Sequence, residues 1–291
     1  KAISITEQVR SCLGLDPGTV SLPPHALLQA ILRAPVDLLY NGGIGTYVKA
    51  SLEGNAEVGD KANDPIRVNG NEVRTKIIAE GGNLGITQLG RIEAALSGVL
   101  LNTDAIDNSA GVDCSDHEVN IKIFVDRMIA AGKMKPAERA GFLHSLTDEV
   151  ASLVLANNTD QNVLLYNDRH LVLAWSPGFE RTMDWLENAT DLDRRLEGLP
   201  SNEQLRERLR SGEGLTAPEL AVLAAYAKIE LAAELNASDL ADDPWFRRVL
   251  RGYFPRLLSE RFEAELEGHP LRRQIVCTVV ANDMINLGGI T

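Results

Sequence analysis

Cysteine is scarce in this sequence of 291 residues, which contains only three. Cys12, Cys114 and Cys277 stand far apart and form no C-x-x-C pair. An odd number of widely spaced thiols is not the framework of a disulfide-stabilised secreted domain. We therefore expect a reducing compartment, with the cytoplasm as the default location.

Long apolar runs and dense basic runs are also missing. No stretch reaches the roughly twenty apolar residues that a membrane-spanning helix requires, and no charged and then apolar leader opens the chain. We therefore expect neither a membrane protein nor a secreted one. The net charge of -12, from 29 basic and 41 acidic residues, argues against a nucleic-acid partner. The length allows one large domain or two ordinary ones.

Several catalytic signatures have no match in the sequence. It contains no G-x-G-x-x-G dinucleotide fingerprint, no G-x-S-x-G elbow and no Cys-His signature. The five histidines do not form metal-ligand pairs, and only the run Asp113, Asp116, His117 and Glu118 suggests a metal. A hydrogen-bonded loop residue is the alternative for His117. We predict no metal site.

Two glycine-rich loops follow predicted strands. The apolar runs 36–40 and 73–80 end in Asn41-Gly42-Gly43-Ile44-Gly45 and in Glu80-Gly81-Gly82-Asn83-Leu84-Gly85. Folds of the α/β type bind ligands at the carboxyl ends of such strands, although a tight turn explains either loop equally well. Further along, polar residues crowd around Gly111 and suggest a second loop of the same site.

The order of elements indicates an α/β layer followed by helices. Helices are predicted at 21–33 and 86–96, an exposed insertion at 51–71, and an apolar run at 99–101, which favours a mainly parallel sheet. A boundary falls near residue 130. Beyond it the sequence predicts helices with an apolar stripe at 142–154, a new helix from Gln161, and a final helix at 275–287. Helix caps are predicted at Ser201 and at Thr216-Ala217-Pro218-Glu219.

Three segments together resemble a known family. APVDLLYNGGIGTYVKA, KIIAEGGNLGITQLGRIE and NTDAIDNSAGVDCSDHEVNIKI closely resemble the large-subunit, NAD-specific class of glutamate dehydrogenase. The resemblance covers essentially the whole chain. It implies that residues 1–130 are the later part of a Rossmann-like catalytic core and that 131–291 are an all-α C-terminal domain.

The resemblance also implies an activity and a set of binding residues. The activity is oxidative deamination of L-glutamate to 2-oxoglutarate and ammonium, with hydride transfer to NAD. Asn83 would lie near the nicotinamide ribose. Asn108 would lie near nicotinamide and substrate, although Ser109 is a serine that the usual loop lacks, and Ser115 would hold the side-chain carboxylate of glutamate. The cofactor cleft would be lined by backbone at Gly42, Gly43, Gly81 and Gly82.

Other parts of the family's active site have no match in the sequence. The glycine fingerprint, the lysines that grip glutamate and the acidic proton carrier are absent, and Lys76 and Asp107 lack the family context to replace them. We therefore assign no catalytic residue and expect no turnover by this chain alone. The start at Lys1 and the end at Thr291, after an apolar segment, suggest a fragment; natural boundaries are the alternative.

The expected partners are the upstream part of the same polypeptide and further copies in a homo-oligomer. A different class of function also remains open, namely a regulatory or oligomerisation module with a degenerate α/β scaffold. The absent fingerprint favours this module, whereas the dense polar loops oppose it.

Overall fold

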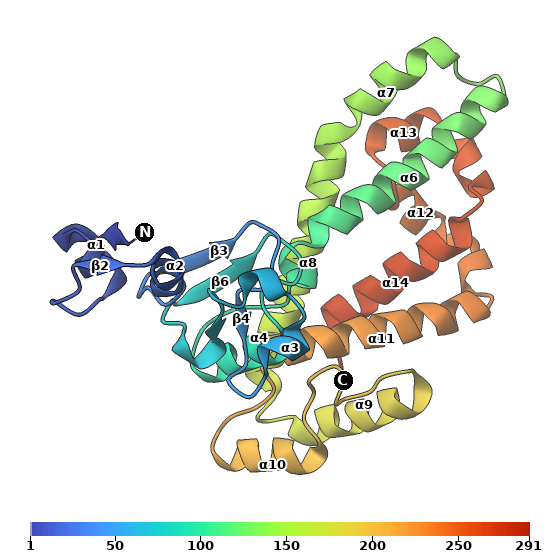
Figure 1. Cartoon of the computed structure of the whole chain (residues 1–291). Helices are drawn as coiled ribbons and strands as arrows, with labels where there is room; N and C mark the ends of the chain where they lie inside the picture. Colours follow the sequence, from blue (N-terminus) through green and yellow to red (C-terminus); the bar gives the residue numbers. More distant parts are fainter. Residues whose placement is uncertain (1) are drawn as a thin grey trace. The chain divides into compact units, whose positions relative to one another are not determined.

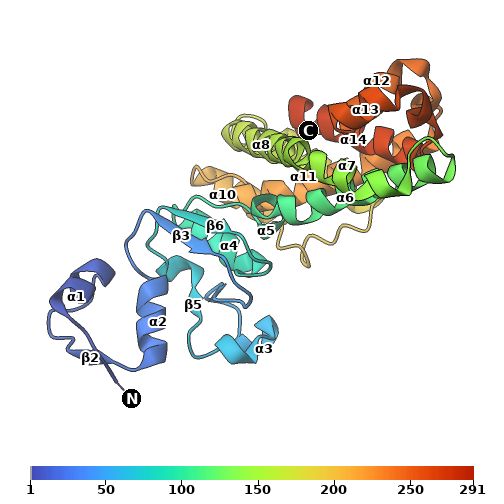
Figure 2. The same ribbon diagram turned by 90° about the horizontal axis from the view of Figure 1, so that it is seen from above.

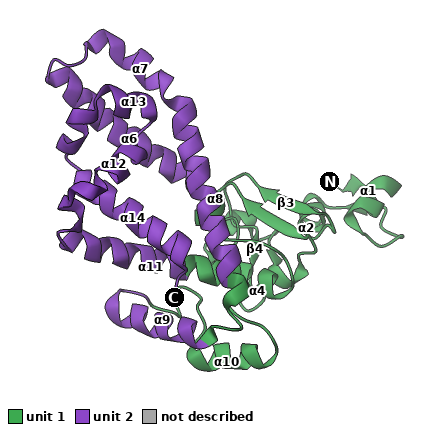
Figure 3. Cartoon of the chain, turned by 180° about the vertical axis from the view of Figure 1, so that it is seen from behind, with its two compact units in different colours: residues 1–108, 169–176, 193–222 green, residues 109–168, 177–192, 223–291 purple. Residues whose placement is uncertain are grey.

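The chain divides into two compact units, which are distinguished by colour in Figure 3. The computed structural model describes residues 2–291. The α/β unit comprises residues 1–108, 169–176 and 193–222, and the helical unit comprises 109–168, 177–192 and 223–291. The chain as a whole is mostly helical and its sheets are small. The domain boundary expected near residue 130 stays a prediction.

Short strands in pairs organise the α/β unit (Figure 1). β3 (Leu38–Asn41) runs parallel to β6 (Ile77–Glu80), and β4 (Val48–Lys49) runs parallel to β5 (Val68–Asn69). An antiparallel pair, β1 (Ile3–Ser4) and β2 (Ser21–Leu22), lies near the start. The predicted run at 99–101 joins β6 through a parallel bridge between Leu100 and Ile77. The predicted parallel pairing is therefore confirmed in small sheets.

Helices of the α/β unit begin and end near the predicted positions. The predicted helices at 21–33 and 86–96 are α2 (Pro24–Leu32) and α4 (Gln88–Leu96), which lie close to β3 and β6 in Figure 2. Apolar side chains of β4, β5, β6 and α4 share one core. The remaining helical elements of this unit are α1 (Glu7–Leu13), α3 (Asn55–Val58), α5 (Asp104–Asp107) and α10 (Asn202–Arg210), with the 3-10 turns Lys61–Asn63 and Gly70–Glu72.

The exposed segment 51–71 is held together by one buried arginine. The Arg67 side chain is fully buried. Its Nε donates to the carbonyl of Thr46 at 2.9 Å, and its Nη1 reaches Asp64 Oδ1 at 2.6 Å and Asn55 Oδ1 at 2.8 Å. Its Nη2 donates to the carbonyl of Asp60 at 2.6 Å. Because Thr46 directly follows the first glycine loop, Arg67 ties the end of that loop to segment 51–71.

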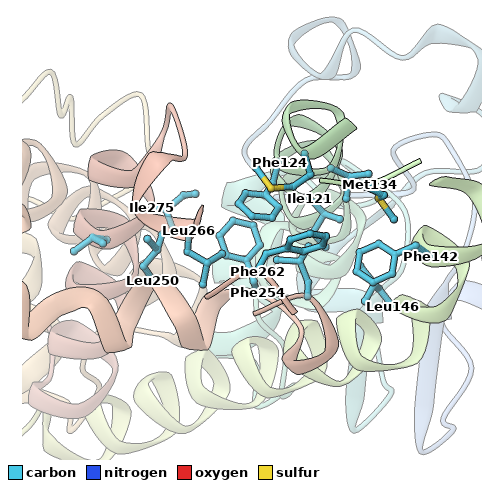
Figure 4. Packing of buried hydrophobic residues seen from close by; sticks show 14 of the residues in the cluster. Ile121, Phe124, Met134, Phe142, Leu146, Leu250, Phe254, Phe262, Leu266 and Ile275 are labelled. Carbon is cyan, nitrogen blue, oxygen red and sulfur yellow. The ribbon is translucent and has the colours of Figure 1, made fainter. Parts of the chain in front are cut away.

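The helical unit is built around aromatic side chains (Figure 4). Phe124 lies 5.9 Å from Phe254 and 5.8 Å from Phe262, measured between ring centroids, and Phe262 meets Phe142 edge to face at 6.1 Å. Phe124 lies on α6 and Phe142 on α7, while Phe254 and Phe262 directly follow α12 and α13, so one core joins helices far apart in sequence. Helical elements that include residues of this unit are α6 (Ser109–Ala130), α7 (Arg139–Ser145), α8 (Thr147–Leu171), α9 (Ser176–Ala189), α11 (Ala217–Ala237), α12 (Arg247–Tyr253), α13 (Arg256–Arg261) and α14 (Arg272–Gly288), with 3-10 turns at Pro136–Glu138, Leu240–Asp242, Pro244–Phe246 and Glu263–Gly268.

Two expectations about the helical unit were wrong. No new helix begins at Gln161, because α8 continues from Thr147 to Leu171. The amides of Asn157 and Asn158 donate to Asp113 Oδ2 and Ser109 Oγ, each at 2.8 Å, and these contacts outweigh the low helix propensity of that segment.

The second error concerns the loop predicted around Gly111. Residues 109–130 form one continuous helix, α6. Its buried positions, His117, Ile121, Phe124, Val125 and Met128, recur at helical spacing and fix it against the core. Packing of this stripe therefore decides the structure of a segment whose polar residues resemble a loop.

The predicted cap at Ser201 forms both bonds of the capping-box pattern, whereas the one at Thr216 shows the reciprocal bond from the backbone N–H. Ser201 and Gln204 form a reciprocal capping box at the start of α10. At the start of α11 the Thr216 N–H donates to Glu219 Oε2 at 2.6 Å, which is the reciprocal bond of the pattern. The Thr216 hydroxyl donates to the same oxygen at 2.7 Å. In residues 2–291, no helix is both long and apolar enough to span a membrane.

Buried histidines make the helical unit sensitive to acid. The His117 ring is 2% exposed and stacks on Tyr253 with 4.5 Å between centroids, and neither ring nitrogen has a hydrogen-bond partner in the described chain.

Burial lowers the pKa of His117, while Asp113 and Asp116 oppose the change. Burial also lowers the pKa of His269. An unfolded histidine titrates near pH 6.5. The two neutral histidines therefore contribute fully to the stability of the helical unit above about pH 6.5. This contribution is lost as the pH drops through their lowered folded-state pKa values.

We expect His117→Phe to stabilise the helical unit by about 1–3 kcal/mol, because the ring stack is kept and two buried nitrogens without a hydrogen bond are removed. The 3.7 Å contact between Nε2 and Asp113 Oδ1 is too long for a hydrogen bond. The stability should also depend less on pH below about pH 6.5. Urea unfolding at several pH values measures both effects. His144→Asn, at an exposed position, is the matched control and should leave the pH dependence unchanged. A destabilised His117→Phe protein would contradict the prediction.

Candidate functional site

The two glycine loops lie side by side at the carboxyl ends of β3 and β6. Asn41 and Glu80 are register partners, so the loops leave the sheet at the same level. The N–H groups of Gly81 and Gly82 both donate to the carbonyl of Asn41, at 2.9 and 3.1 Å. The parallel arrangement thus brings together the two loops that the sequence singled out.

Close backbone contact requires glycine at position 82. A Cβ added there would lie 2.4 Å from the carbonyl oxygen of Gly43. A Cβ at Gly81 would meet the Tyr40 hydroxyl at 2.1 Å, and a Cβ at Gly42 would meet the ring of the same tyrosine at 2.8 Å. Tyr40, which is 64% exposed, therefore lies across both loops. Tyr40 has no predicted role in the site, because its place in an apolar run is that of an ordinary strand residue.

The amides of Asn83 and Asn108 meet. Asn108 Nδ2 donates to Asn83 Oδ1 at 3.0 Å. Asn83 lies in the exposed loop after β6, and Asn108 is the residue that ends α5. The structure therefore joins two of the predicted cofactor-binding residues. Ser115 lies in the helical unit, exposed on α6, and not in the loop that was expected to carry it.

The first residue of the second loop, Glu80, forms a buried ion pair with Arg91. Glu80 and Arg91 are 1% and 4% exposed, and the guanidinium binds both carboxylate oxygens, from Nε at 2.6 Å and from Nη2 at 3.0 Å. Arg91 Nη2 also lies 3.0 Å from Asp104 Oδ1. Burial raises the pKa of Glu80, against the effect of Arg91, and burial likewise raises the pKa of Asp107, whose Oδ2 accepts from the Glu80 N–H at 2.9 Å.

Leu84 adopts a left-handed backbone conformation at the tip of this loop. Its φ is 56°, and no other non-glycine residue among those described has a positive φ. The conformation costs about 1–2 kcal/mol for a residue with a Cβ. Strain of this kind persists where surrounding bonds fix it, and it is concentrated at functional sites.

An apolar cavity of about 220 Å³ lies against the first loop. Asn41 is one of its lining residues, and the buried Nδ2 of this side chain has no hydrogen-bond partner within the described residues. Buried donors are normally satisfied, so a ligand acceptor would suit this amide. The lining residues are Leu28, Ile31, Leu32, Leu39, Tyr40, Asn41, Gly43, Tyr47, Val48, Ile66, Ile78, Gly85 and Ile86.

The groups left unassigned from the sequence show no catalytic arrangement. Lys76 is 78% exposed and pairs with Asp37 at 2.7 Å, and the hydrogen bond that its ammonium donates to this carboxylate raises the pKa of the lysine. A lysine that acts as a base needs a lowered pKa, so Lys76 is unsuited to that role. Within residues 2–291, no three His, Cys, Asp or Glu side chains are grouped to hold a metal ion.

Comparison with known proteins supplies the family. Residues 1–168 match the model of the bacterial NAD-glutamate dehydrogenase catalytic domain, and residues 212–291 match that of the glutamate dehydrogenase C-terminal region. The chain belongs to the bacterial NAD-glutamate dehydrogenase family. The resemblance noted in the sequence is thus confirmed, and the polar residues around the glycine loops lie within its catalytic-domain match.

Similar proteins are known from several bacteria. The NAD-specific glutamate dehydrogenases of Mycobacterium tuberculosis, Pseudomonas aeruginosa and Halomonas elongata are 52%, 48% and 47% identical to the chain over its full length. In each case the aligned part is 18% of the relative's own length. The chain therefore spans about a fifth of these family members.

Proposed function

We propose that the chain supplies part of the active site of an NAD-dependent glutamate dehydrogenase, which oxidises L-glutamate to 2-oxoglutarate and ammonium. The observation that carries the proposal is the pair of neighbouring glycine loops at the carboxyl ends of two parallel strands, in a chain of this family. The strands would then belong to a larger Rossmann-like sheet. Ligands of such sheets bind at this edge. The family match also makes the non-catalytic module the weaker alternative.

The residues present suit one half of NAD. Neutral amide donors and close glycine backbone suit the nicotinamide and ribose, which Asn83 and Asn108 would hold beside Gly42, Gly43, Gly81 and Gly82. The unpaired amide of Asn41 and the close approach of Gly82 to Gly43 support this fit. Nicotinamide, when bound, supplies the hydride acceptor. The glycine fingerprint for the pyrophosphate has no match in the sequence, so that contact would come from other residues of the complete enzyme.

Ser115 would bind the side-chain carboxylate of glutamate, because an exposed hydroxyl at this position can donate to it. The catalytic lysines and the proton carrier would lie outside this chain. We further propose that the complete enzyme is a cytoplasmic homo-oligomer.

In the native-length protein, Asn83→Ala should raise the KM for NAD about tenfold, which corresponds to one lost hydrogen bond. Ser115→Ala should raise the KM for glutamate by a similar factor and leave the KM for NAD unchanged. Steady-state kinetics of glutamate oxidation measure both. Asn71→Ala and Ser152→Ala, at exposed positions, are the controls. No glutamate-dependent reduction of NAD by the wild-type protein would refute the proposed function.

A further inference from the structure

The left-handed residue Leu84 is held from both sides. Its N–H donates to Asp104 Oδ2 at 2.7 Å, and its carbonyl accepts from the Thr46 hydroxyl at 2.7 Å. Leu84 itself is 66% exposed, so side-chain packing does not fix it. Both backbone polar groups of Leu84 are therefore bound by side chains from other segments, one directly after the first glycine loop and one at the start of α5.

Asp104 is itself held in place by a buried cation. Arg91 Nη2 lies 3.0 Å from its Oδ1, while the same guanidinium binds Glu80. Glu80 Oε1 in turn accepts from the N–H of Ile86 at 3.1 Å. One arginine thus links a carboxylate that binds the tip of the loop to another that binds its far end. Charged hydrogen bonds of this kind are shorter and stronger than neutral ones.

The direction of the Asn83 side chain depends on this arrangement. Asn83 precedes Leu84, and the Leu84 N–H belongs to the peptide bond between the two residues. The hydrogen bond from this N–H to Asp104 therefore fixes the peptide bond next to Asn83. Its amide meets Asn108, which ends the short helix that Asp104 begins. We infer that Asp104, held by Arg91, is a positioning residue that orients Asn83 for the cofactor. This inference rests on the proposed function.

A double-mutant cycle in the native-length protein tests the inference. Asp104→Ala should raise the KM for NAD about tenfold and change kcat less than twofold. Asp104→Asn, which keeps an acceptor for the Leu84 N–H, should bring the KM back to within about threefold of wild type. If Asp104 acts through Asn83, the protein with both Asp104→Ala and Asn83→Ala should match Asn83→Ala alone. The control is Asp37→Ala, at an exposed ion pair beside β3, and it should have no effect.

A second readout separates orientation from general stability. Asp104→Ala should speed hydrogen exchange in the peptide 81–87 and leave the Tm within a few degrees of wild type. Additive effects in the cycle, or wild-type kinetics for Asp104→Ala, would overturn the inference and leave the proposed function standing. If the wild type does not oxidise glutamate, the proposed function fails. Calorimetry with NAD then decides the inference. It uses the four proteins of the cycle, namely the wild type, Asp104→Ala, Asn83→Ala and the double variant. Additive losses of affinity, or no binding to the wild type, would overturn the inference.

Discussion

Arg67→Ala is expected to lower the stability of the α/β unit by about 3–5 kcal/mol, because it removes a fully buried cation from its partners. The loss takes the arginine donor from the carbonyl of Thr46 and the carboxylate of Asp64, and it leaves the carbonyl of Asp60 with only the Asn63 N–H. Hydrogen exchange of peptides from the first glycine loop and from 51–71 measures the local free energy of opening.

Two further variants make the Arg67 test specific. Arg67→Lys keeps the charge but cannot reproduce the planar set of donors, so it should recover only a minor part of the loss. Lys61→Ala, at an exposed position in the same segment, should change the free energy by less than about 0.5 kcal/mol. Equal exchange rates for wild type and Arg67→Ala would show that the segment does not depend on this arginine.

Glu219→Ala, at the start of α11, should lower the stability of the chain by a comparable amount. The Glu219 side chain is almost fully buried and binds Arg208 through two hydrogen bonds, of 2.7 and 3.0 Å, besides its two bonds to Thr216. Removal of the carboxylate leaves a largely buried guanidinium and an uncapped helix start, so we expect a loss of about 3–5 kcal/mol. Thermal unfolding and exchange at the first turn of α11 measure the change.

Charge and hydrogen bonding at this cap can be separated. Glu219→Gln keeps an acceptor for the Thr216 N–H, so it should cost less than the alanine variant. Glu213→Ala, at an exposed position nearby, should cost less than about 0.5 kcal/mol. A loss of stability below about 1 kcal/mol for Glu219→Ala would refute the importance of the buried pair.

Local sequence signals predicted the loops of the candidate site but not what holds them. Glycines after apolar runs mark strand ends, and parallel strands place such ends together, so the meeting of the Asn41 and Glu80 loops could be predicted. The contacts of Arg91 with Glu80 and Asp104 could not, because they join residues across a turn, where neither helical nor strand periodicity applies. Only folding reveals that Arg91 is buried.

The two wrong predictions for the helical unit also arose because local sequence does not show tertiary contacts. Polar residues such as Asp113 and Asp116 are common in loops, and local composition therefore indicated a loop where α6 forms. The new helix predicted from Gln161 is likewise part of α8, in which the amides of Asn157 and Asn158 find partners within the unit. Tertiary contacts outweighed local propensity in both cases. Caps at Ser201 and Thr216 were predictable because each depends on residues three positions apart.

The contact between Arg67 and Thr46 also bears on the order of events during synthesis. Arg67 follows by 21 residues the carbonyl that it binds. On the ribosome, the first glycine loop therefore emerges well before the donor that completes it. Its final form must await the exit of the whole intervening segment, so this loop matures only after Arg67 has left the exit tunnel.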